Sequence, residues 1–519
     1  MSKAVNPIIP LDYPDPDVIR VNDTYYMVTT TMHFMPGCEI LSSSDLVHWS
    51  HCTFVYDRLD STEGQTLQCG KNSYGKGMWA ACLRYHNGYF YVFFVANDTQ
   101  KTYVYKAKEM AGPWEKSVMA GFYHDCSVLF EEDRVYIAYG NRDIWLTELH
   151  PDLSGPKPGG LHRLIISDQD NPNLGYEGAH LYKINGRYYI FLIHSHPSYW
   201  RRIQACYVAN SLTDDFIGKD VLDDDRGYCN QGVAQGGIVD TPEGNWFAVL
   251  FQDHGAVGRL PILLPIHWEN EFPIFGEDGK VPVEVTIIEA AQDTSRPALV
   301  GSDDFRQSYP TPYGLYPQWQ FNHEPTVAGF KLDTETGKFS LKAIKLSKNI
   351  TEAANTLTQR MWFPACQGEV TIDGSQLKVG DIAGLSAFQG AYGFVGITRE
   401  AAGLFVIMKS RELDNMSLQA MPADETAGKE WERFPLSDEV VRIRVEVDFL
   451  NMNDKARFYF QSPTGFQQIG PDHQLAFKMD HFTGCRFGLF HYATKTTGGT
   501  AVFSDFHYIR HREKDVGNF

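Results

Sequence analysis

Apolar and polar positions alternate along residues 1–290 in a pattern that recurs five times. Each unit has an apolar strand, a tight turn rich in Asn, Asp or Gly, and an aromatic-rich apolar strand. The five units are "PDPDVIRVNDTYYMVTTT", "WAACLRYHNGYFYVFFV", "HDCSVLFEEDRVYIAYG", "EGAHLYKINGRYYIFLI" and "QGGIVDTPEGNWFAVLF". Their turns VND, HNG, EED, ING and EGN have the composition of β-hairpin turns. The pattern therefore predicts five related β-hairpins.

One aromatic position in the second strand sets the register between the units. It is occupied by Tyr26, Tyr91, Tyr136, Tyr189 and Phe247. A further strand-like run follows each hairpin, so a unit holds three or four strands, and helical periodicity is nearly absent. Strand-built units that recur at such intervals, about 45 to 65 residues, are typical of a β-propeller. We predict a five-bladed β-propeller over residues 1–290.

The second half of the chain predicts a separate β domain. The stretch "EAAQDTSRPALVGSDDF" has the composition of a linker, which we place at residues 291–304. Residues 305–519 then alternate between apolar and polar positions with a period of two, separated by Gly, Asn and Asp turns, which is typical of a β-sandwich. The predicted fold class is all-β, a five-bladed propeller followed by a sandwich. The sandwich either stabilises the propeller or helps to shape its binding pocket.

Counting back from the aromatic position locates one slot at the start of each unit. Asp15 and Asp125 precede that position by the same spacing, and Trp79, Glu177 and Gln235 precede it by a spacing one position longer. The first strand of each blade lines the channel of a propeller, so these side chains should ring one mouth of that channel. An acidic residue can occupy a turn for structural reasons, but clustered carboxylates repel one another. We interpret the three acids as functional.

Three carboxyl groups around a funnel suit the hydrolysis of glycosidic bonds. That reaction needs one carboxyl group as acid and another as base or nucleophile on opposite sides of the bond. A third carboxylate can raise the pKa of the acid by repulsion, and a Trp side chain can wall the sugar ring. A carbohydrate-binding protein without catalysis would need no such acid and base pair, and it remains the alternative.

Composition and charge limit the classes of partner and the compartment that we expect. The net charge of −18 disfavours nucleic acid and anionic membrane surfaces, because both attract basic patches. No apolar run reaches the length of a membrane span, and the first residues lack the apolar core of a secretory signal. Nine scattered Cys residues without a CxxC motif indicate thiols in a reducing compartment. We expect a cytoplasmic protein, and its oligomeric state stays open.

Several stretches together resemble glycoside hydrolase family 43, in its two-domain group of β-xylosidases and α-L-arabinofuranosidases. They are "NPIIPLDYPDPDVIRVNDTYYMVTTT", "MPGCEILSSSDLVHW", "GMWAACLRYHNGYFYVFF", "HDCSVLF", "YEGAHLYKINGRYYIFL", "GGIVDTPEGNWFAVLFQD" and "GAVGRLPILLPIHW", in order along the predicted propeller. The resemblance implies that Asp15 is the general base and Glu177 the general acid. It implies that Asp125 modulates the pKa and position of the acid.

The resemblance also implies residues that contact the sugar. Trp79 would wall the first subsite with Phe34 beside it, and Arg259 in "GAVGR" would reach sugar hydroxyls. His180 is either near the site or a core histidine. Gln235 stands where many relatives carry a His before Gly-Gly, which leaves the sugar preference open.

For the second domain the resemblance implies a jelly-roll-like sandwich with a loop that closes the propeller pocket. We expect this loop at residues 493–500, where a wall would favour attack at chain ends. The chemistry requires no cofactor, but relatives often hold structural calcium. Asp304 and Asp505 match the sandwich position for calcium, and His254 could face an ion in the channel. As bare sequence features these three are ordinary surface or core residues.

The expected function is therefore that of an inverting exo-glycosidase. It would release terminal α-L-arabinofuranose, β-D-xylose or both from small xylan-derived oligosaccharides. One alternative is the carbohydrate-binding protein without catalysis. The other is a retaining fructosidase-like propeller, although the Trp-Met-Asn-Asp-Pro start that those enzymes resemble is absent.

Overall fold

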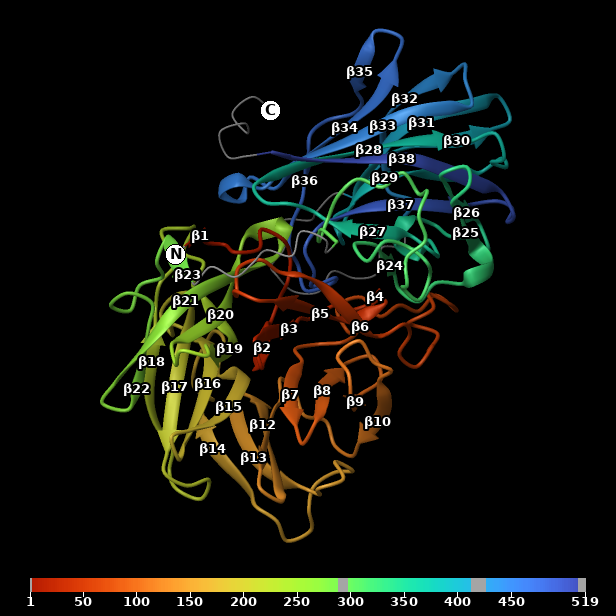
Figure 1. Cartoon of the computed structure of the whole chain (residues 1–519). Coiled ribbons are helices and arrows are strands. Elements are labelled where there is room, and N and C mark those ends of the chain that lie inside the picture. The colour runs from red at the N-terminus through yellow and green to blue at the C-terminus, as the bar shows by residue number, and fades with distance from the viewer. Residues whose placement is uncertain (1, 288–296, 412–425, 512–519) are drawn as a thin grey trace.

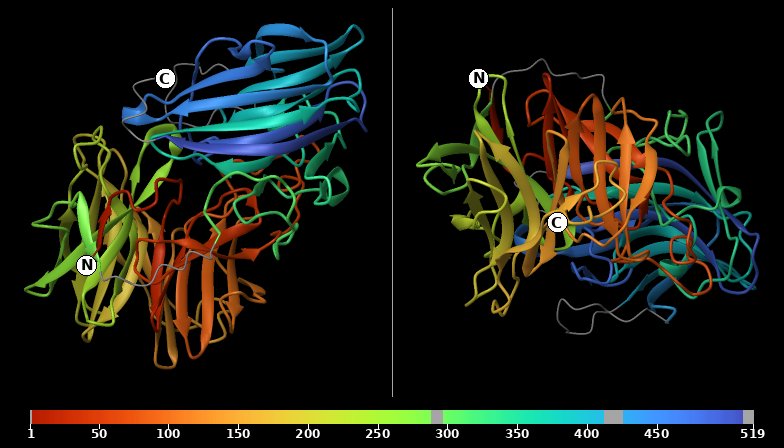
Figure 2. Two further views of the ribbon diagram at one scale, coloured as in Figure 1. Left: turned by 45° about the horizontal axis from the view of Figure 1, so that its top comes forward. Right: turned by 90° about the horizontal axis from the view of Figure 1, so that it is seen from below.

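Two β domains stack on one another in the computed structural model, which describes residues 2–287, 297–411 and 426–511 (Figure 1). The N-terminal domain forms the lower half of Figure 1 and the C-terminal domain the upper half, and the left view of Figure 2 separates the two layers. In the described part of the chain the helices are four short 3-10 turns: η1 (Gly255–Val257), η2 (Val327–Gly329), η3 (Ile350–Glu352) and η4 (Leu450–Met452). The predicted all-β class is confirmed.

Five antiparallel sheets of four strands each make up the N-terminal domain. The first is β2 (Asp17–Val21), β3 (Thr24–Val28), β5 (Gly37–Ser43) and β6 (Ser50–Tyr56), and the second is β7 (Cys82–His86), β8 (Tyr89–Ala96), β9 (Lys101–Ala107) and β10 (Glu115–Met119). The third is β11 (Ser127–Glu131), β12 (Arg134–Asn141), β13 (Asp143–Leu149) and β14 (His162–Ser167). The fourth is β15 (Glu177–Ile184), β16 (Arg187–Ser195), β17 (Arg202–Ala209) and β18 (Ile217–Leu222). The fifth is β19 (Ala234–Asp240), β20 (Trp246–Asp253), β21 (Arg259–Glu269) and β22 (Phe272–Phe275).

The first strand of every sheet lies at the centre of the domain. The strands β2, β7, β11, β15 and β19 contact one another in a closed ring, in which β19 returns to β2. The predicted five-bladed propeller is therefore confirmed, with four strands in each blade. Near the end of blade five, β1 (Ser2–Val5) pairs with β23 (Glu284–Ile287), which fastens the N-terminus to the last blade.

The C-terminal domain is a sandwich of two large antiparallel sheets, as predicted. One runs in the order β32 (Lys429–Leu436), β31 (Gly403–Ser410), β30 (Gly393–Glu400), β29 (Asp381–Phe388), β37 (Arg486–Ala493), β27 (Leu357–Arg360), β24 (Gln320–Asn322) and β4 (Phe34–Met35). The other is β25 (Phe330–Asp333), β26 (Lys338–Lys342), β38 (Thr500–His511), β28 (Ala365–Asp373), β33 (Val440–Asp448), β34 (Lys455–Ser462) and β35 (Gly465–Gln468), with β36 (His473–Gln474) paired to β34.

The expected linker is only partly visible. Residues 291–296 lie outside the described residues, and Asp303 already forms a β-bridge with Phe506 of β38. None of the helices in the described ranges has the length and hydropathy needed to span a membrane.

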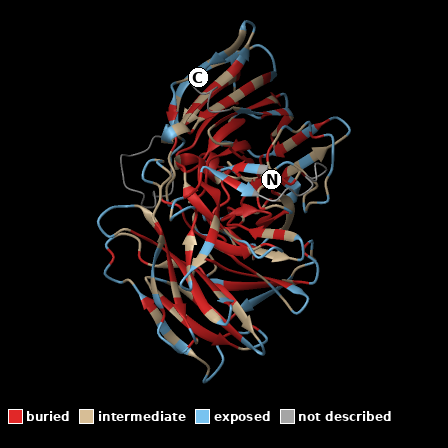
Figure 3. Cartoon of the chain, turned by 60° about the vertical axis from the view of Figure 1, so that its left-hand side comes forward, coloured by how far each residue is buried: buried red, intermediate tan, exposed pale blue. Residues whose placement is uncertain are grey.

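The two domains share one sheet and one core. Strand β4 comes from the propeller half of the chain but pairs with β24 of the sandwich. Figure 3 shows buried residues continuing through the joint, where Leu11 and Tyr13 of the propeller belong to the same cluster as Leu357 and Cys485 of the sandwich. This continuity fixes the sandwich over one end of the propeller.

A buried ion pair crosses the joint. Arg360 of β27 bonds Glu39 of β5 at 2.7 Å, and the two side chains are 3% and 2% exposed. The same guanidinium lies 4.0 Å from the centre of the Tyr13 ring, and Glu39 also bonds His51 at 2.9 Å. Removing one partner would leave a charge buried without compensation, which is costly.

We expect Arg360→Leu to lower the free energy of unfolding by about 3–5 kcal/mol, because it strands the Glu39 carboxylate. Urea unfolding followed by fluorescence measures this change. The matched control is Arg433→Leu, which breaks an exposed pair with Glu400 and should cost less than about 1 kcal/mol. Equal effects of the two substitutions would contradict the structural role of the buried pair.

Candidate active site

The acidic residues of the repeat slot lie at the start of the innermost strands. Asp15 lies two residues before β2, Asp125 lies two residues before β11, and Glu177 is the first residue of β15. Trp79 lies three residues before β7, and Gln235 is the second residue of β19. The structure therefore places all five at the start of a first strand, as the count from the aromatic position predicted.

Backbone conformation refines the register of this slot. Asp15, Asp125 and Gln235 adopt left-handed backbone with φ of 52°, 47° and 55°, and in blade four this position is Gly178, with φ of 63°. On the first strand of each of these blades, one residue pairs with the aromatic residue that sets the register. The residue with left-handed backbone lies four positions before that paired residue in all four blades. Glu177 is thus the residue before this position, and a register shift follows it between Glu177 and His180.

Asp15 is held by two donors at the mouth. Arg259 Nη1 donates to one carboxylate oxygen at 2.7 Å, and Thr30 Oγ1 donates to the other at 2.8 Å. Arg259 Nε lies 3.4 Å from the Asp253 carboxylate, so the guanidinium sits between two acids. The side chain of Asp15 is 7% exposed. This arrangement fixes both the orientation and the ion pairing of the Asp15 carboxylate.

Asp125 and Glu177 form a tight group with His124. His124 Nε2 lies 3.7 Å from Asp125 Oδ2 and 3.7 Å from Glu177 Oε2, and one ligand atom from each residue lies within 4.8 Å of the others. Asn141 at the end of β12 donates to Glu177 Oε2 at 2.5 Å. Asp15 is not part of this group, so the mouth holds one isolated, arginine-bound carboxylate and one carboxyl pair with a histidine.

The charge of His124 influences the protonation of Asp125 and Glu177. Burial alone would lower the pKa of His124, but Asp125, Glu177 and Asp15 raise it to about 9, so the imidazole is a cation at neutral pH. Burial, together with repulsion from Glu177 and Asp15, raises the pKa of Asp125 to about 7. Burial would raise the pKa of Glu177 as well, yet His124 and the arginines at 202 and 259 hold it below its usual value.

These directions correct one expectation. The like-charge repulsion that was expected to raise the pKa of Glu177 acts instead on Asp125, because the His124 cation lies 3.7 Å from Glu177 and lowers the pKa of that carboxyl group. In the free protein the proton of the carboxyl pair therefore resides on Asp125. A role of Glu177 as general acid requires the pair to pass this proton to Glu177 when a leaving oxygen approaches.

Trp79 and Phe482 form an aromatic wall at the mouth. Their ring centres lie 5.4 Å apart, and Trp79 also lies 5.6 Å from the His124 ring. Phe482 belongs to the sandwich and packs 4.4 Å from the Arg259 guanidinium. Its segment is fastened to the propeller, because the Gly484 N–H donates to Asp12 and the Cys485 N–H donates to the Ala256 carbonyl.

The wall from the sandwich is therefore residues 477–484, and the expected loop at 493–500 was wrong. Thr497 accepts a bond from Lys378, and Gly498 donates to Ala343. Both partners belong to the sandwich, so the loop between β37 and β38 packs on its own domain.

Phe34 and His180 lie away from the mouth, whereas Gln235 stays within its ring. Phe34 is only 1% exposed, because β4 pairs into the sandwich and the Arg486 guanidinium lies 3.5 Å from its ring, so Phe482 and not Phe34 stands beside Trp79. His180 bonds Asp17 at 3.2 Å inside the channel, below the mouth. The backbone N–H of Gln235 donates to Gln204 Oε1, and its side chain lies against Gly178, where a Cβ atom would meet the carboxamide carbon at 2.7 Å. Its contact with a sugar stays a prediction.

The two aspartates expected to hold calcium already have partners within the protein, and the calcium site stays a prediction. Asp505 pairs with Arg442 at 3.2 Å and bonds His507, so its charge is already compensated, and the exposed Asp304 caps the Arg306 N–H. His254 follows β20, the second strand of blade five, and lies outside the ring of innermost strands. Its ring packs between Tyr228 and Phe363, 4.2 and 4.7 Å away, and burial beside Arg226 lowers its pKa to about 3, which keeps the imidazole neutral. Neutral imidazole is the form that binds metal ions, so the assignment of His254 stays a prediction.

Sequence reasoning missed four residues of the site. His124 directly precedes a predicted acid in "HDC". Its position beside the acids could therefore be inferred once Asp125 had been assigned to the site. Arg202 and Asn141 lie at strand ends of blades four and three that the repeat also places at the mouth. Phe482 carried no signal, because its position depends on how the sandwich docks.

Comparison with known proteins adds an independent observation. Residues 4–273 match the family described as "Glycosyl hydrolases family 43", and residues 302–509 match "Beta xylosidase C-terminal Concanavalin A-like domain". The chain is 26% identical to a beta-xylosidase of Formosa agariphila, over 95% of this chain and 88% of that protein. It is 28% identical to a non-reducing end alpha-L-arabinofuranosidase of Bacteroides ovatus, over 68% of each.

Solved structures share the arrangement of both domains. A protein described as a bifunctional GH43-CE of Bacteroides eggerthii has a TM-score of 0.90 and 40% identity, and the alignment covers 99% of this chain. This chain spans 64% of that protein's length. A GH43 glycoside hydrolase engineered to display endo-xylanase and exo-arabinofuranosidase activity has a TM-score of 0.85 and 25% identity, over 98% of this chain and 99% of that one.

We expect His124→Asn to move the alkaline limb of the kcat/KM profile to higher pH by about one unit or more. Removing the cation raises the pKa of the Asp125–Glu177 pair, so the pair keeps its proton longer as the pH rises. Profiles on one substrate from pH 4 to 10 measure the limb. A purely structural role of His124 would lower the rate without moving the limb, and a shift to lower pH would contradict the charge assignment.

We expect Asp125→Asn to stabilise the protein increasingly as the pH rises. The folded pKa of about 7 exceeds the unfolded value of about 3.9. The contribution of Asp125 to the free energy of unfolding is therefore fully present below pH 4 and is lost as the pH rises through 7. The amide cannot titrate, so the variant should gain about 4 kcal/mol relative to wild type between pH 4 and 8. Thermal unfolding at several pH values measures this, and a pH-independent difference would contradict it.

Proposed function

The chain belongs to glycosyl hydrolases family 43, and we propose that it is an inverting, exo-acting hydrolase of terminal α-L-arabinofuranosyl or β-D-xylosyl groups. Its substrates are short xylan-derived oligosaccharides. The observation that carries this proposal is the division of the mouth into two carboxyl sites. Asp15 is ion-paired with Arg259, and Asp125, whose raised pKa favours a retained proton, lies beside Glu177 and His124.

Inversion requires a base that activates water on one face of the sugar and an acid on the other face. In the proposed reaction Asp15 accepts a proton from a water molecule whose oxygen attacks the anomeric carbon. The bond from that carbon to the glycosidic oxygen breaks, and Glu177 passes to the departing oxygen the proton that it receives from Asp125. Asp125 and His124 hold the proton supply next to Glu177, and Arg259 keeps the Asp15 carboxylate oriented.

The choice of sugars rests on the relatives. Among the proteins similar to this chain are a beta-xylosidase and a non-reducing end alpha-L-arabinofuranosidase. Cleavage at chain ends is supported by the wall of Trp79 and Phe482, since Phe482 enters the mouth from the sandwich. We also propose a cytoplasmic location, which the nine free cysteines support. The protein would then act on imported oligosaccharides.

Substrates with different leaving groups distinguish the role of the acid from that of the base. We expect Asp15→Asn to lower kcat/KM by at least about 100-fold on nitrophenyl glycosides and on xylobiose alike, because water activation is needed for both. In Glu177→Gln we expect kcat/KM to fall at least about 100-fold on xylobiose. It should fall much less on nitrophenyl glycosides, because nitrophenolate leaves without protonation.

Steady-state kinetics on both substrates measures these effects, with thermal unfolding as the control for folding. Equal losses in Glu177→Gln on the two substrates would contradict its role as the acid, and full activity in either variant would reject the assignment. NMR of the first anomer released by the wild type tests inversion. A product with the configuration of the substrate would overturn it.

A further inference from the structure

Two exposed aromatic side chains stand on the rim of blade four. Tyr199 and Trp200 are each 39% exposed and lie in the connection between β16 and β17. This connection is at the same end of the blade as Glu177, because Glu177 pairs with Ile193 near the end of β16 and Ser195 pairs with Arg202. The connection that carries the two rings is therefore at the mouth end of blade four, the blade of the proposed acid.

Arg202 links Trp200 to the carboxyl groups. Its guanidinium carbon lies 5.6 Å from the centre of the Trp200 ring, and its Nε bonds Asp253 at 2.6 Å. The charge of Arg202 is also among the causes that lower the pKa of Glu177. One side chain thus separates Trp200 from the acidic group of the mouth.

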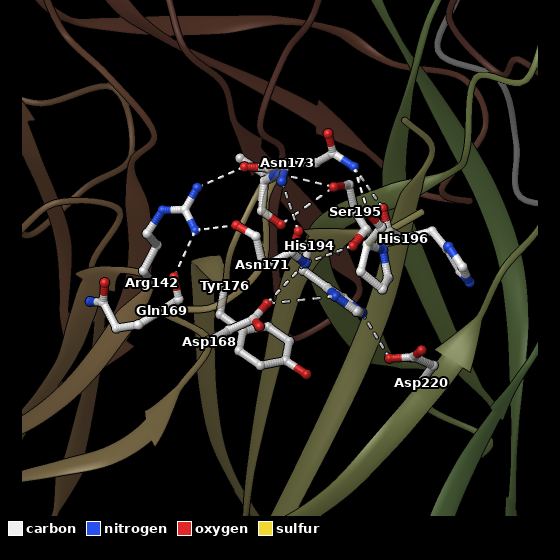
Figure 4. Close-up of polar contacts among 12 residues, drawn as sticks. Arg142, Asp168, Gln169, Asn171, Asn173, Tyr176, His194, Ser195, His196 and Asp220 are labelled. Atoms are coloured by element: carbon white, nitrogen blue, oxygen red, sulfur yellow. Dashed lines mark hydrogen bonds and ion pairs between the residues drawn. The ribbon is translucent and has the colours of Figure 1, made fainter. Parts of the chain in front are cut away.

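A network of partly buried polar contacts holds the start of this connection (Figure 4). Arg142 donates to the carbonyls of Asn171 and Asn173 at 2.6 and 2.7 Å. The Asn173 amide then donates to the carbonyls of His196 and Pro197 at 3.0 and 3.3 Å. Figure 4 shows Arg142 and His196 at opposite ends of this chain of contacts, so the loop before β15 ties blade three to the β16–β17 connection.

The rings themselves are fixed as well. Tyr199 stacks on His196 with ring centres 4.2 Å apart, and its hydroxyl accepts a bond from Arg201 at 3.0 Å. The Trp200 carbonyl accepts a bond from the Asn230 amide at 2.7 Å. Two adjacent aromatic side chains that are ordered by the protein and still open to solvent form a prepared surface for a ligand with apolar faces.

We propose that Tyr199 and Trp200 bind the part of the oligosaccharide beyond the cleaved bond. This inference rests on the proposed function, because a general acid protonates the leaving oxygen and the leaving chain therefore lies on the side of Glu177. Sugar rings present apolar C–H faces that pack on aromatic rings. The ligand class is a neutral pentose oligosaccharide that extends past the first leaving unit.

The test compares substrates of different length. We measure kcat/KM for xylobiose and xylotetraose in the wild type, Tyr199→Ala and Trp200→Ala, and also Trp200→Phe, which keeps a ring. We expect the tetraose-to-biose ratio to fall about 10-fold in Trp200→Ala, which corresponds to about 1.4 kcal/mol, and to fall less in Trp200→Phe. Calorimetric binding of xylotetraose to Asp15→Asn, with and without Trp200→Ala, should show the same loss.

The matched control is Tyr89→Ala. Tyr89 is 38% exposed and starts β8 at the turn after β7, the end of blade two away from the mouth, so the ratio should not change. An unchanged ratio in Trp200→Ala, or a fall as large in Tyr89→Ala, overturns the inference. If the wild type hydrolyses neither these substrates nor nitrophenyl glycosides, the proposed function fails instead, and calorimetry with Trp200→Ala in the otherwise wild-type chain still decides whether the aromatic pair binds the oligosaccharide.

Discussion

The buried carboxylate of Asp17 organises the axis of the propeller. It accepts bonds from Arg84 Nη1 at 2.7 Å and lies 3.2 Å from the His180 ring, and Arg84 reaches on to Ser127 at 2.7 Å. These side chains come from the innermost strands of blades one, two, three and four. Blade five approaches through Gly237, where a Cβ atom would meet the Asp17 carboxylate at 2.8 Å. Although burial would raise the pKa of Asp17, Arg84 and His180 hold it below its usual value, so the axis keeps an ionised centre.

This axis explains how three more carboxylates can face one another above it. The first strands cannot spread apart, because their shared ion pair is buried and costly to break. The repulsion at the mouth is instead relieved chemically, by cations placed beside each acid and by one retained proton. Arg259 neutralises Asp15, His124 neutralises Glu177, and Asp125 carries the proton. The burial that raises the pKa of Asp125 thus serves as a proton store next to the proposed acid.

The sequence predicted the features that follow from the repeated hairpins. It did not predict the features that depend on how the sandwich packs against the propeller. Five hairpins with one aromatic register are a local pattern, so the blades and the ring of Asp15, Asp125 and Glu177 followed from it. Phe34 was misplaced because β4 leaves its blade to pair with the sandwich, a contact between distant parts of the chain that no local pattern encodes. The wall at Phe482 was missed for the same reason, since residues 477–484 reach the mouth only through the packing of the two domains.

Asp12 shows that the sandwich shapes the pocket and does not merely stabilise the propeller. One oxygen of its buried carboxyl group accepts the backbone N–H of Arg259 at 2.9 Å, and the other accepts the N–H of Gly484 at 2.7 Å. Arg259 orients Asp15 through its guanidinium, and Gly484 lies two residues from Phe482. A single carboxyl group therefore positions both the arginine that holds the proposed base and the segment that brings Phe482 to the mouth. Because the two bonds use the same side chain, the position of the sandwich and the geometry of the mouth are set together.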